Sequence, residues 1–248
     1  MPSLLRHWTH TALSRLPAAA LPRVCALCSM NAPSGLCDGC QTQFFAQRHH
    51  RCRRCAIPLS LNVANDHECG DCLRQPPAFD ATIAAVDYAA PADRMVLGLK
   101  FAARLELAPI CAAMMRDALL TRSDMTLPNF LCAVPLGQQR LAERGFNQAL
   151  EVARPLSRSL GIRLIPELAF RQRDTHAQAR LDPAERQKNV HDAFCLSAKT
   201  IDLVRSAHIG IVDDVMTTGQ TMHELAVTLK RFGAARVTGI VFARTPQQ

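Results

Sequence analysis

Two adjacent carboxylates, Asp213 and Asp214, follow an apolar run and precede a hydroxyl-rich turn that contains Gly219. Carboxylates in that position can accept hydrogen bonds from the vicinal hydroxyls of a sugar. The glycine lets the backbone approach a ligand closely, and the free amides at the N-terminus of a following helix attract a phosphate group. The pattern therefore predicts a site for a phosphorylated ribose.

The turn after the carboxylates supplies the expected phosphate-binding groups. These are Val215, Met216, Thr217, Thr218, Gly219, Gln220 and Thr221. The competing interpretation is an acidic strand end followed by an ordinary helix cap, since Thr and Asp cap helices well. A Walker B strand is excluded, because the sequence contains no Gly-x-x-x-x-Gly-Lys-Ser/Thr loop. The stretch instead resembles the 5-phosphoribosyl-1-pyrophosphate (PRPP) motif of type I phosphoribosyltransferases.

Cations suited to a pyrophosphate group occur in two other segments. Arg140 and Arg144 follow the apolar run 131–135, and Lys100 is the only lysine in the first half of the main domain. An arginine fork can contact two phosphate oxygens at once. We therefore expect Lys100 to bind PRPP and both arginines to be catalytic together with the carboxylate pair. Solvated surface charges are the competing interpretation.

The polar and basic stretch 171–189 is weakly periodic, and we expect it to form a mobile flap over this site. Its candidate residues are Thr175, Gln178 and Arg186, with His176 as its most obvious titratable group. A flap that closes over a substrate excludes water from a reactive intermediate.

Eight of the eleven cysteines form four Cys-x-x-Cys pairs. The pairs are Cys25/Cys28, Cys37/Cys40, Cys52/Cys55 and Cys69/Cys72. Two such pairs complete a tetrahedral four-thiolate zinc site, so we expect two structural zinc ions. Sequential pairing closes the shortest loops, with interleaved pairing as the open alternative. A disulfide framework is disfavoured by the identical spacings. Loss of Cys52 is expected to unfold the second zinc module locally and leave the C-terminal sheet intact.

Arginines are concentrated around the second pair of cysteine motifs, in the stretch Arg48 to Arg54. Because a four-thiolate zinc centre carries two negative charges, these arginines could simply compensate it. The alternative is a nucleic-acid-binding patch, in which Phe44 and Phe45 would stack on bases. The remaining cysteines, Cys111, Cys132 and Cys195, lie among apolar residues and are expected to be core thiols.

Buried strands and amphipathic helices must hold the candidate residues in place. The apolar residues 209–212 predict a strand, and the periodic residues 225–232 predict the helix after the turn. Further strands are expected at 79–88, 131–135 and 237–242, and further helices at 97–120 and up to residue 160. Strands separated by helices form a mostly parallel sheet, whose ligands bind beyond the carboxyl ends of the strands. The predicted fold class is therefore α/β, with a mostly parallel sheet and flanking helices.

The length of 248 residues and the 48% hydrophobic content allow one sizeable core and a small second module. The net charge of +8 comes almost entirely from arginine and favours an anionic partner. We expect an N-terminal amphipathic segment at 1–24, the cysteine-rich module at 25–75 and the main domain at 78–248. The first segment would dock on the protein itself, with membrane contact or targeting as alternatives. No apolar run reaches membrane-spanning length, so a cytoplasmic protein is expected.

Several motifs together resemble the ComF family of competence-associated bacterial proteins. The motifs are the four cysteine pairs, Leu99-Lys100-Phe101, Val134-Pro135-Leu136 with Arg140 and Arg144 to Gln148, Thr175 with Gln178, Leu181, Arg186 and Asn189, and the stretch from Ile211 to Thr221. Where the family usually has His after Val-Pro-Leu, this chain has Gly137. Any role of that histidine is absent here or has moved.

The resemblance implies a type I phosphoribosyltransferase-like domain behind a double zinc ribbon, with PRPP and Mg²⁺ as ligands. It also implies a role in competence, in handling imported single-stranded DNA and in contact with uptake machinery at the inner membrane. Two functions are therefore expected. One is a phosphoribosyltransferase, in the glycosyltransferase class, whose acceptor no motif identifies. The other is a non-enzymatic DNA-uptake factor that senses PRPP and binds single-stranded DNA through its zinc module.

Overall fold

The computed structural model describes residues 24–46, 49–59, 68–172 and 193–246. The chain divides into two compact units, Met1–Ala46 and Gln47–Gln248. In the first unit, a bridge joins Val24 to Asn31 ahead of helix α2 (Asp38–Phe45). The expected N-terminal segment 1–24 lies outside the described residues except for Val24. The expected domain boundary between residues 75 and 78 stays a prediction.

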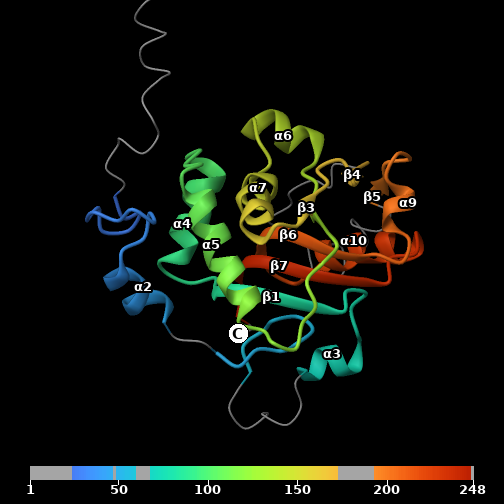
Figure 1. Ribbon diagram of the computed structural model, residues 1–248, viewed down its shortest axis with the longest axis horizontal. Helices are drawn as coiled ribbons and strands as arrows, with labels where there is room; N and C mark the ends of the chain where they lie inside the picture. The colour runs from blue at the N-terminus through green and yellow to red at the C-terminus, as the bar shows by residue number, and fades with distance from the viewer. Residues whose placement is uncertain (1–23, 47–48, 60–67, 173–192, 247–248) are drawn as a thin grey trace, which may run out of the picture. The chain divides into compact units, whose positions relative to one another are not determined.

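The second unit contains all other helices and strands that the structure describes (Figure 1). They are α3 (Gly70–Arg74), β1 (Ala81–Asp87), α4 (Ala92–Phe101), α5 (Leu107–Leu120), β2 (Phe130–Ala133), α6 (Gln138–Arg144), α7 (Gln148–Leu160), β3 (Arg163–Leu164), β4 (Ala169–Arg171), β5 (Phe194–Leu196), α9 (Ile201–Val204), β6 (His208–Met216), α10 (Gln220–Arg231) and β7 (Arg236–Arg244).

Five strands form a parallel sheet in the order β1-β7-β6-β2-β3. Its central strands β6 and β7 are buried along most of their length, as expected for strands covered on both faces. A separate antiparallel pair joins β4 to β5. Because the five strands are parallel, their carboxyl ends lie at one edge of the sheet, where ligands of such sheets bind.

Helices cover both faces of the sheet. Helices α5 and α7 contact each other and the sheet, whereas α10 contacts β7 and β5. Right-handed crossovers explain this division. The units β2-α7-β3 and β6-α10-β7 advance in opposite directions across the sheet, so a right-handed connection places their helices on opposite faces. Figure 1 shows α5 and α7 in front of the sheet and α10 behind it. The predicted α/β fold with a mostly parallel sheet is confirmed.

Two of the expected elements differ from the observed ones. The single helix predicted at 97–120 is wrong, because the chain forms α4 and α5 with a break between them. Pro109 explains the break, since its ring would clash with the carbonyl four residues earlier if α5 began sooner. The polar loop expected after Pro135 instead contains α6, which ends at Gly145 with a φ of +80°.

The segment around the second pair of cysteine motifs belongs to the same compact unit as the sheet and packs on its edge strand. The Thr82 amide of β1 donates to the Arg53 carbonyl at 3.1 Å. Near the other end of β1, Arg51 forms an ion pair with Asp87 at 2.7 Å. Among the strands that the structure describes, β1 pairs with β7 alone, so this segment covers an edge that would otherwise expose unpaired backbone groups.

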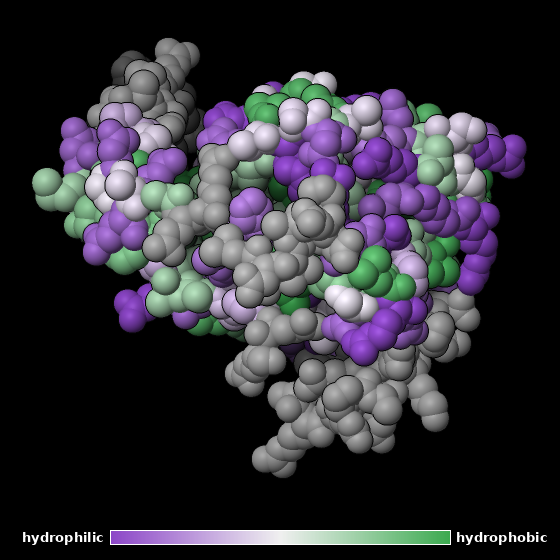
Figure 2. Space-filling model, turned by 90° about the horizontal axis from the view of Figure 1, so that it is seen from below, coloured by the Kyte–Doolittle hydropathy of each residue, from purple (hydrophilic) through white to green (hydrophobic). Residues whose placement is uncertain are grey.

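The described surface is mixed in character. Figure 2 shows hydrophilic residues over much of one face, interrupted by smaller apolar areas. Every helix in the described ranges is too short or too polar to cross a bilayer. Of the expected core thiols, Cys111 and Cys132 are buried and Cys195 is partly exposed.

Candidate functional site

The two candidate carboxylates lie near the carboxyl end of β6, which extends through Met216 and is longer than the sequence pattern predicted. Successive side chains of a strand point to opposite faces, so Asp213 and Asp214 have different surroundings. Asp214 is buried, with 2% of its surface exposed, whereas Asp213 is partly exposed.

Asp214 is held by side chains from two helices. Its Oδ2 lies 2.6 Å from Nζ of Lys100, the last but one residue of α4, and its Oδ1 accepts from Nε2 of Gln148 at 3.2 Å. Gln148 is the first residue of α7 and is itself buried. The structure therefore brings the predicted Lys100 to the carboxylate pair, and adds Gln148, which ended a family motif but was not a predicted site residue.

Asp213 has an unusual protonation equilibrium. Although part of the residue reaches the surface, protein atoms surround its carboxyl group, and this burial raises its pKa well above the usual range. The neighbouring charge of Asp214 adds to the increase, and Lys100 opposes it. The pair is therefore a place where a cation or a hydroxyl donor would favour the charged carboxylate.

The two candidate arginines lie on α6, close to the same edge of the sheet. Arg144 donates from Nη1 to Oε1 of Gln148, which links it through one residue to Asp214. Its guanidinium lies 5.4 Å from the centre of the exposed Phe101 ring. Burial lowers the pKa of Arg144, and the positive charge of Arg140 lowers it further. The negative charge of Asp214 raises this pKa and so partly offsets both effects. Gly137, at the position of the family's histidine, is the N-cap of α6.

The β6–α10 loop, Met216 to Gly219, turns the chain into α10. Gly219 is the N-cap of α10 with a φ of +85°, a conformation that side-chain-bearing residues rarely adopt. A Cβ atom at this position would lie 2.6 Å from the Met216 methyl group. Thr217 and Thr218 are exposed, and the Thr218 hydroxyl accepts from the Gln220 amide at 3.3 Å. The loop thus has the backbone conformation and exposed hydroxyls that a phosphate cradle requires.

A buried arginine that the sequence analysis missed supports this loop from beneath. Arg244, the last residue of β7, donates from Nη1 to the carbonyls of Met216 (3.2 Å), Thr217 and Thr245 (2.8 Å). Its Nε donates to the Cys55 carbonyl at 2.8 Å. A buried arginine at a strand end is visible in the sequence only as an Arg that ends an apolar run, which is a weak signal.

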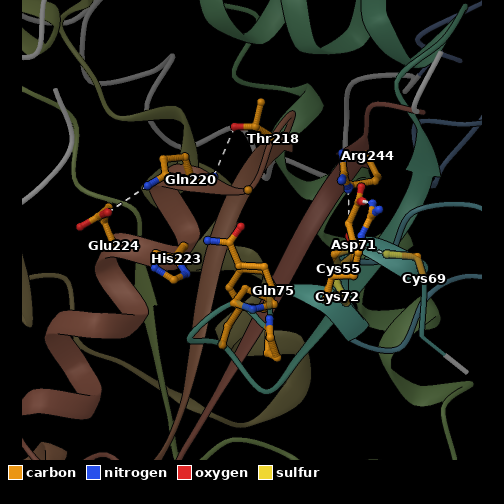
Figure 3. A pocket seen from close by; sticks show the side chains of 15 residues that line it. Cys55, Cys69, Asp71, Cys72, Gln75, Thr218, Gln220, His223, Glu224 and Arg244 are labelled. Carbon is orange, nitrogen blue, oxygen red and sulfur yellow. Dashed lines mark hydrogen bonds and ion pairs between the residues drawn. The ribbon is translucent and has the colours of Figure 1, made fainter. Parts of the chain in front are cut away.

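A cavity of about 830 Å³ lies between this arginine, the second cysteine cluster and α10. Figure 3 shows Gln220 and His223 of α10 on one side, with Arg244, Cys55 and Cys72 on the other. Nδ1 of His223 accepts from the Ala78 amide at 3.0 Å, so this histidine has a structural partner. The cavity borders Thr218 and Gly219 of the β6–α10 loop.

The eight paired cysteines form two clusters, one in each compact unit. The clusters are Cys25, Cys28, Cys37 and Cys40, and Cys52, Cys55, Cys69 and Cys72, with the sulfurs of each within 4.8 Å of one another. A tetrahedral zinc with Zn–S bonds of about 2.3 Å requires sulfur–sulfur distances of about 3.8 Å. The measured 3.6 Å for Cys28–Cys37 and for Cys55–Cys69 fits that requirement. Sequential pairing is confirmed, and both donor sets fit structural zinc.

Hydrogen bonds link the thiols of the second cluster. Hydrogen bonds from the Cys55 and Cys72 thiols hold the pKa of Cys52 well below its usual range, against the opposing effect of burial. The Cys52 sulfur also accepts from the amides of Cys55 at 3.5 Å and Cys69 at 3.2 Å. The same hydrogen bonds raise the pKa of Cys55 and Cys72. Cys52 is thus held as a thiolate, the form that zinc binds, whereas Cys55 and Cys72 must lose protons when a metal binds.

The described arginines of the basic stretch each form an ion pair. Arg51 pairs with Asp87, Arg53 with Asp124 at 3.6 Å, and Arg54 with Glu68 at 3.1 Å. Phosphates of a nucleic acid would therefore compete with protein carboxylates for these side chains. Arg48 and the flap candidates Thr175, His176, Gln178 and Arg186 lie outside the described residues.

Known proteins match this chain along most of its length. Residues 17–73 match the model of the double zinc ribbon domain. The chain is 35% identical over 230 residues to the DNA utilization protein YhgH of Escherichia coli (strain K12), covering 91% of this chain and 98% of that protein. It is 30% identical over 210 residues to competence protein F of Haemophilus influenzae, covering 83% of this chain and 89% of that protein.

The chain belongs to the ComF family. The resemblance based on the cysteine pairs and the Asp213–Asp214 motif is confirmed, as is the double zinc ribbon. Among solved structures, the chain is similar to the glutamine PRPP amidotransferase of B. subtilis, with 15% identity, 54% of this chain and 26% of that chain covered, and a TM-score of 0.36. It is also similar to the HGPRT-ase of Leishmania tarentolae, with 17% identity, 55% of this chain and 66% of that chain covered, and a TM-score of 0.31.

Proposed function

We propose that this ComF-family protein binds PRPP at the carboxyl edge of its sheet and acts as a phosphoribosyltransferase in DNA utilization. The observation that carries the proposal is the convergence on β6 of the carboxylate pair, Lys100 and the β6–α10 loop with its positive-φ Gly219. The amides of the loop and of α10 would bind the 5-phosphate. The names of the E. coli and H. influenzae relatives support the link to DNA utilization and competence.

The carboxylates would bind the ribose hydroxyls, and their charge would favour Mg²⁺. Hard oxygen ligands are what Mg²⁺ prefers, and Asp213 supplies a carboxylate from a residue that is partly exposed. Asp214 is held by Lys100 and Gln148 and would act mainly by fixing the geometry and charge of the site. When bound, Mg²⁺ supplies a charge that neutralises the pyrophosphate oxygens.

The arginines of α6 would stabilise the leaving group. In transfer, the bond between C1 of the ribose and the pyrophosphate oxygen breaks, and its electron pair leaves with pyrophosphate. An acceptor nucleophile then forms the new bond to C1 and loses a proton. Arg140 and Arg144 would stabilise the charge that develops on the leaving oxygens, and Arg144 is already anchored by Gln148.

Calorimetry with PRPP and Mg²⁺ tests the proposal. The wild type is compared with the D213N/D214N variant, which keeps side-chain size and some hydrogen bonding. Lost charge-assisted hydrogen bonds predict an affinity lower by about tenfold to a hundredfold. Circular dichroism checks that the variant is folded. A wild type that fails to bind PRPP overturns the proposal, whereas binding without pyrophosphate release with any acceptor class removes only its enzymatic part.

The second candidate is a PRPP-sensing, non-enzymatic DNA-uptake factor in the cytoplasm, near uptake machinery at the inner membrane. The observations in its favour are the arginine-rich stretch Arg48 to Arg54 in the segment around the second cysteine cluster, here called the zinc segment, and the names of the relatives. Single-stranded DNA binding by this segment would weaken steeply with salt, because phosphate contacts release counterions. Since Arg51, Arg53 and Arg54 are ion-paired, a D87N variant, which frees Arg51, should bind DNA more tightly if this segment is the site. An affinity independent of both salt and D87N would exclude it.

A further inference from the structure

We infer that Arg244 is a positioning residue that fixes the β6–α10 loop and couples PRPP binding to the metal state of the second cysteine cluster. The inference rests on the proposed function, because the loop is the proposed 5-phosphate cradle. It concerns a contact between two parts of the chain that lie far apart in sequence: the zinc segment around Cys55 and the loop at residues 216–219.

Arg244 is buried and held by hydrogen bonds. Only 4% of its surface is exposed, and its guanidinium donates to four backbone carbonyls. Three of these carbonyls, those of Met216, Thr217 and Thr245, lie at the ends of β6 and β7. The fourth belongs to Cys55, a ligand of the second cluster. One rigid, planar group thus links the loop to a cysteine whose backbone would be fixed by metal binding.

The orientation of two peptide groups explains how this contact would affect a ligand. Because a trans peptide is planar, its carbonyl and its N–H point in opposite directions. When the Met216 and Thr217 carbonyls point toward Arg244, the amides of Thr217 and Thr218 point away from it. The Met216 carbonyl has a second donor, the Thr245 amide at 3.1 Å, which reinforces the same orientation. Arg244 therefore presents two consecutive amides to the proposed phosphate position without contacting the ligand.

The second cluster holds the other end of this link. Cys55 is buried, and its amide donates to the Cys52 sulfur at 3.5 Å. A zinc ion bound to Cys55 would fix the backbone whose carbonyl accepts from Arg244. Loss of the metal would release that carbonyl and weaken the restraint on the loop. By thermodynamic linkage, PRPP binding must then increase the zinc affinity of this cluster by the same factor.

A conservative substitution tests the positioning role. R244K keeps the positive charge but loses the fork that reaches Cys55 and the loop together, and PRPP affinity should fall by about tenfold. R54Q is the matched control, because Arg54 pairs with Glu68 inside the zinc segment and should leave PRPP affinity unchanged. Both variants should retain two zinc ions per chain by native mass spectrometry. Unchanged PRPP affinity in R244K, with the wild type binding PRPP, overturns the inference and leaves the proposed function standing.

A second measurement uses zinc itself as the readout, and its decisive comparison, made in C37S, does not require R244K to fold. The C37S variant leaves only the second cluster intact, and its zinc affinity is measured by equilibrium competition with a chromogenic chelator. PRPP with Mg²⁺ should raise that affinity by the factor by which zinc in the second cluster raises PRPP affinity. The R244K/C37S variant should lose the effect. A zinc affinity that PRPP leaves unchanged in C37S overturns the coupling, whereas a wild type that never binds PRPP overturns the proposed function first.

Discussion

Asp213 and Asp214 are chemically identical neighbours with different surroundings. Asp214 is buried and has Lys100 and Gln148 as partners, so its charge is compensated inside the protein. Asp213 has a pKa raised by burial and by the charge beside it. Asp213 is therefore the carboxyl group of the pair whose protonation would respond to a ligand.

PRPP binding should release protons through Asp213. The carboxylate of the free protein is protonated below its raised pKa, and hydroxyl donors or a cation favour the charged form. Affinity should therefore increase as pH rises toward the pKa of the free protein, by up to about tenfold per pH unit, and then level off. Calorimetry in buffers of different ionisation enthalpy counts the protons. D213N is the control, because it retains the titration of the PRPP phosphates, and an identical proton count in D213N would contradict the prediction.

Lys100 should contribute to stability as well as to binding. K100Q leaves the buried Asp214 carboxylate without its cation, and removing one partner of such a pair costs about 3 kcal/mol of unfolding free energy. The K100Q/D214N double variant should recover part of this loss, because it leaves no unpaired charge. Urea unfolding of K100Q, D214N and the double variant measures the coupling, and additive losses would show that the pair contributes nothing as a unit.

The sequence was sufficient to identify the residue types of this site, but not their partners. The motif around Asp213 and the isolated Lys100 stand out because carboxylates and lysines are unusual next to apolar runs. The role of Gln148, which only ended a family motif, and that of Arg244 do not stand out, since their contacts are with residues 66 and 189 positions away in the chain. Contacts over such separations depend on the packing of the sheet and cannot be read from local periodicity.

At the scale of elements, strand periodicity was the better guide. Buried strands such as β6 and β7 gave continuous apolar runs, and both were predicted within a few residues. The break between α4 and α5 was missed because apolar spacing persists through it, while the decisive feature is one proline in the first turn of α5. Helix α6 was missed because none of its residues is buried, so no apolar stripe marks it.

Gly219 determines where β6 ends and α10 begins. G219A should cost about 1 to 2 kcal/mol, the penalty for a side chain in the left-handed conformation. It should also lower PRPP affinity, because the new Cβ displaces the Met216 methyl group. G219N separates the two effects, since Asn tolerates a positive φ but still adds a Cβ. The unfolding free energy measured in urea should be higher in G219N than in G219A, while the PRPP affinity measured by calorimetry stays low. Full recovery of PRPP affinity in G219N would show that only backbone strain matters.

His208 makes the β6–β7 pairing sensitive to acid. Its Nε2 lies 2.8 Å from the Thr238 hydroxyl, and burial lowers its pKa to about 4. The unfolded chain takes up a proton near pH 6.5 and the native chain does not, so stability should fall as pH decreases from about 6.5 to 4, by about 3 kcal/mol in total. The difference in unfolding free energy between wild type and H208Q, followed across this range, isolates the histidine from metal release. A difference that does not change with pH would contradict the assignment.

At the scale of the whole chain, the two cysteine clusters are not equivalent. The first lies in the unit Met1–Ala46, and the second lies in the unit that contains the sheet. Composition and spacing cannot distinguish them, because all four cysteine pairs have the same form. The distinction arises from contacts of the second segment with β1 and with Arg244.

Loss of each cluster should therefore have a different consequence. The sequence alone predicts that removing Cys52 unfolds only the second zinc module. The hydrogen bond from Thr82 to Arg53, the Arg51–Asp87 ion pair and the Arg244 link argue that C52S also uncovers β1 and destabilises the sheet. We expect a loss of about 2 to 4 kcal/mol, as for other broken buried networks. C37S removes a ligand of the first cluster and should leave the sheet unchanged.

Hydrogen exchange of the β7 amides, read by mass spectrometry, measures sheet stability directly, because central strands exchange through the largest openings. Native mass spectrometry should find two zinc ions in the reduced wild type and one in each variant; fewer than two in the wild type would contradict the pairing of all eight cysteines. Faster β7 exchange in C52S alone supports the asymmetry. Equal exchange in C52S and C37S would mean that the second zinc segment is an independent module, because its contacts with β1 and Arg244 would then contribute no measurable stability to the sheet.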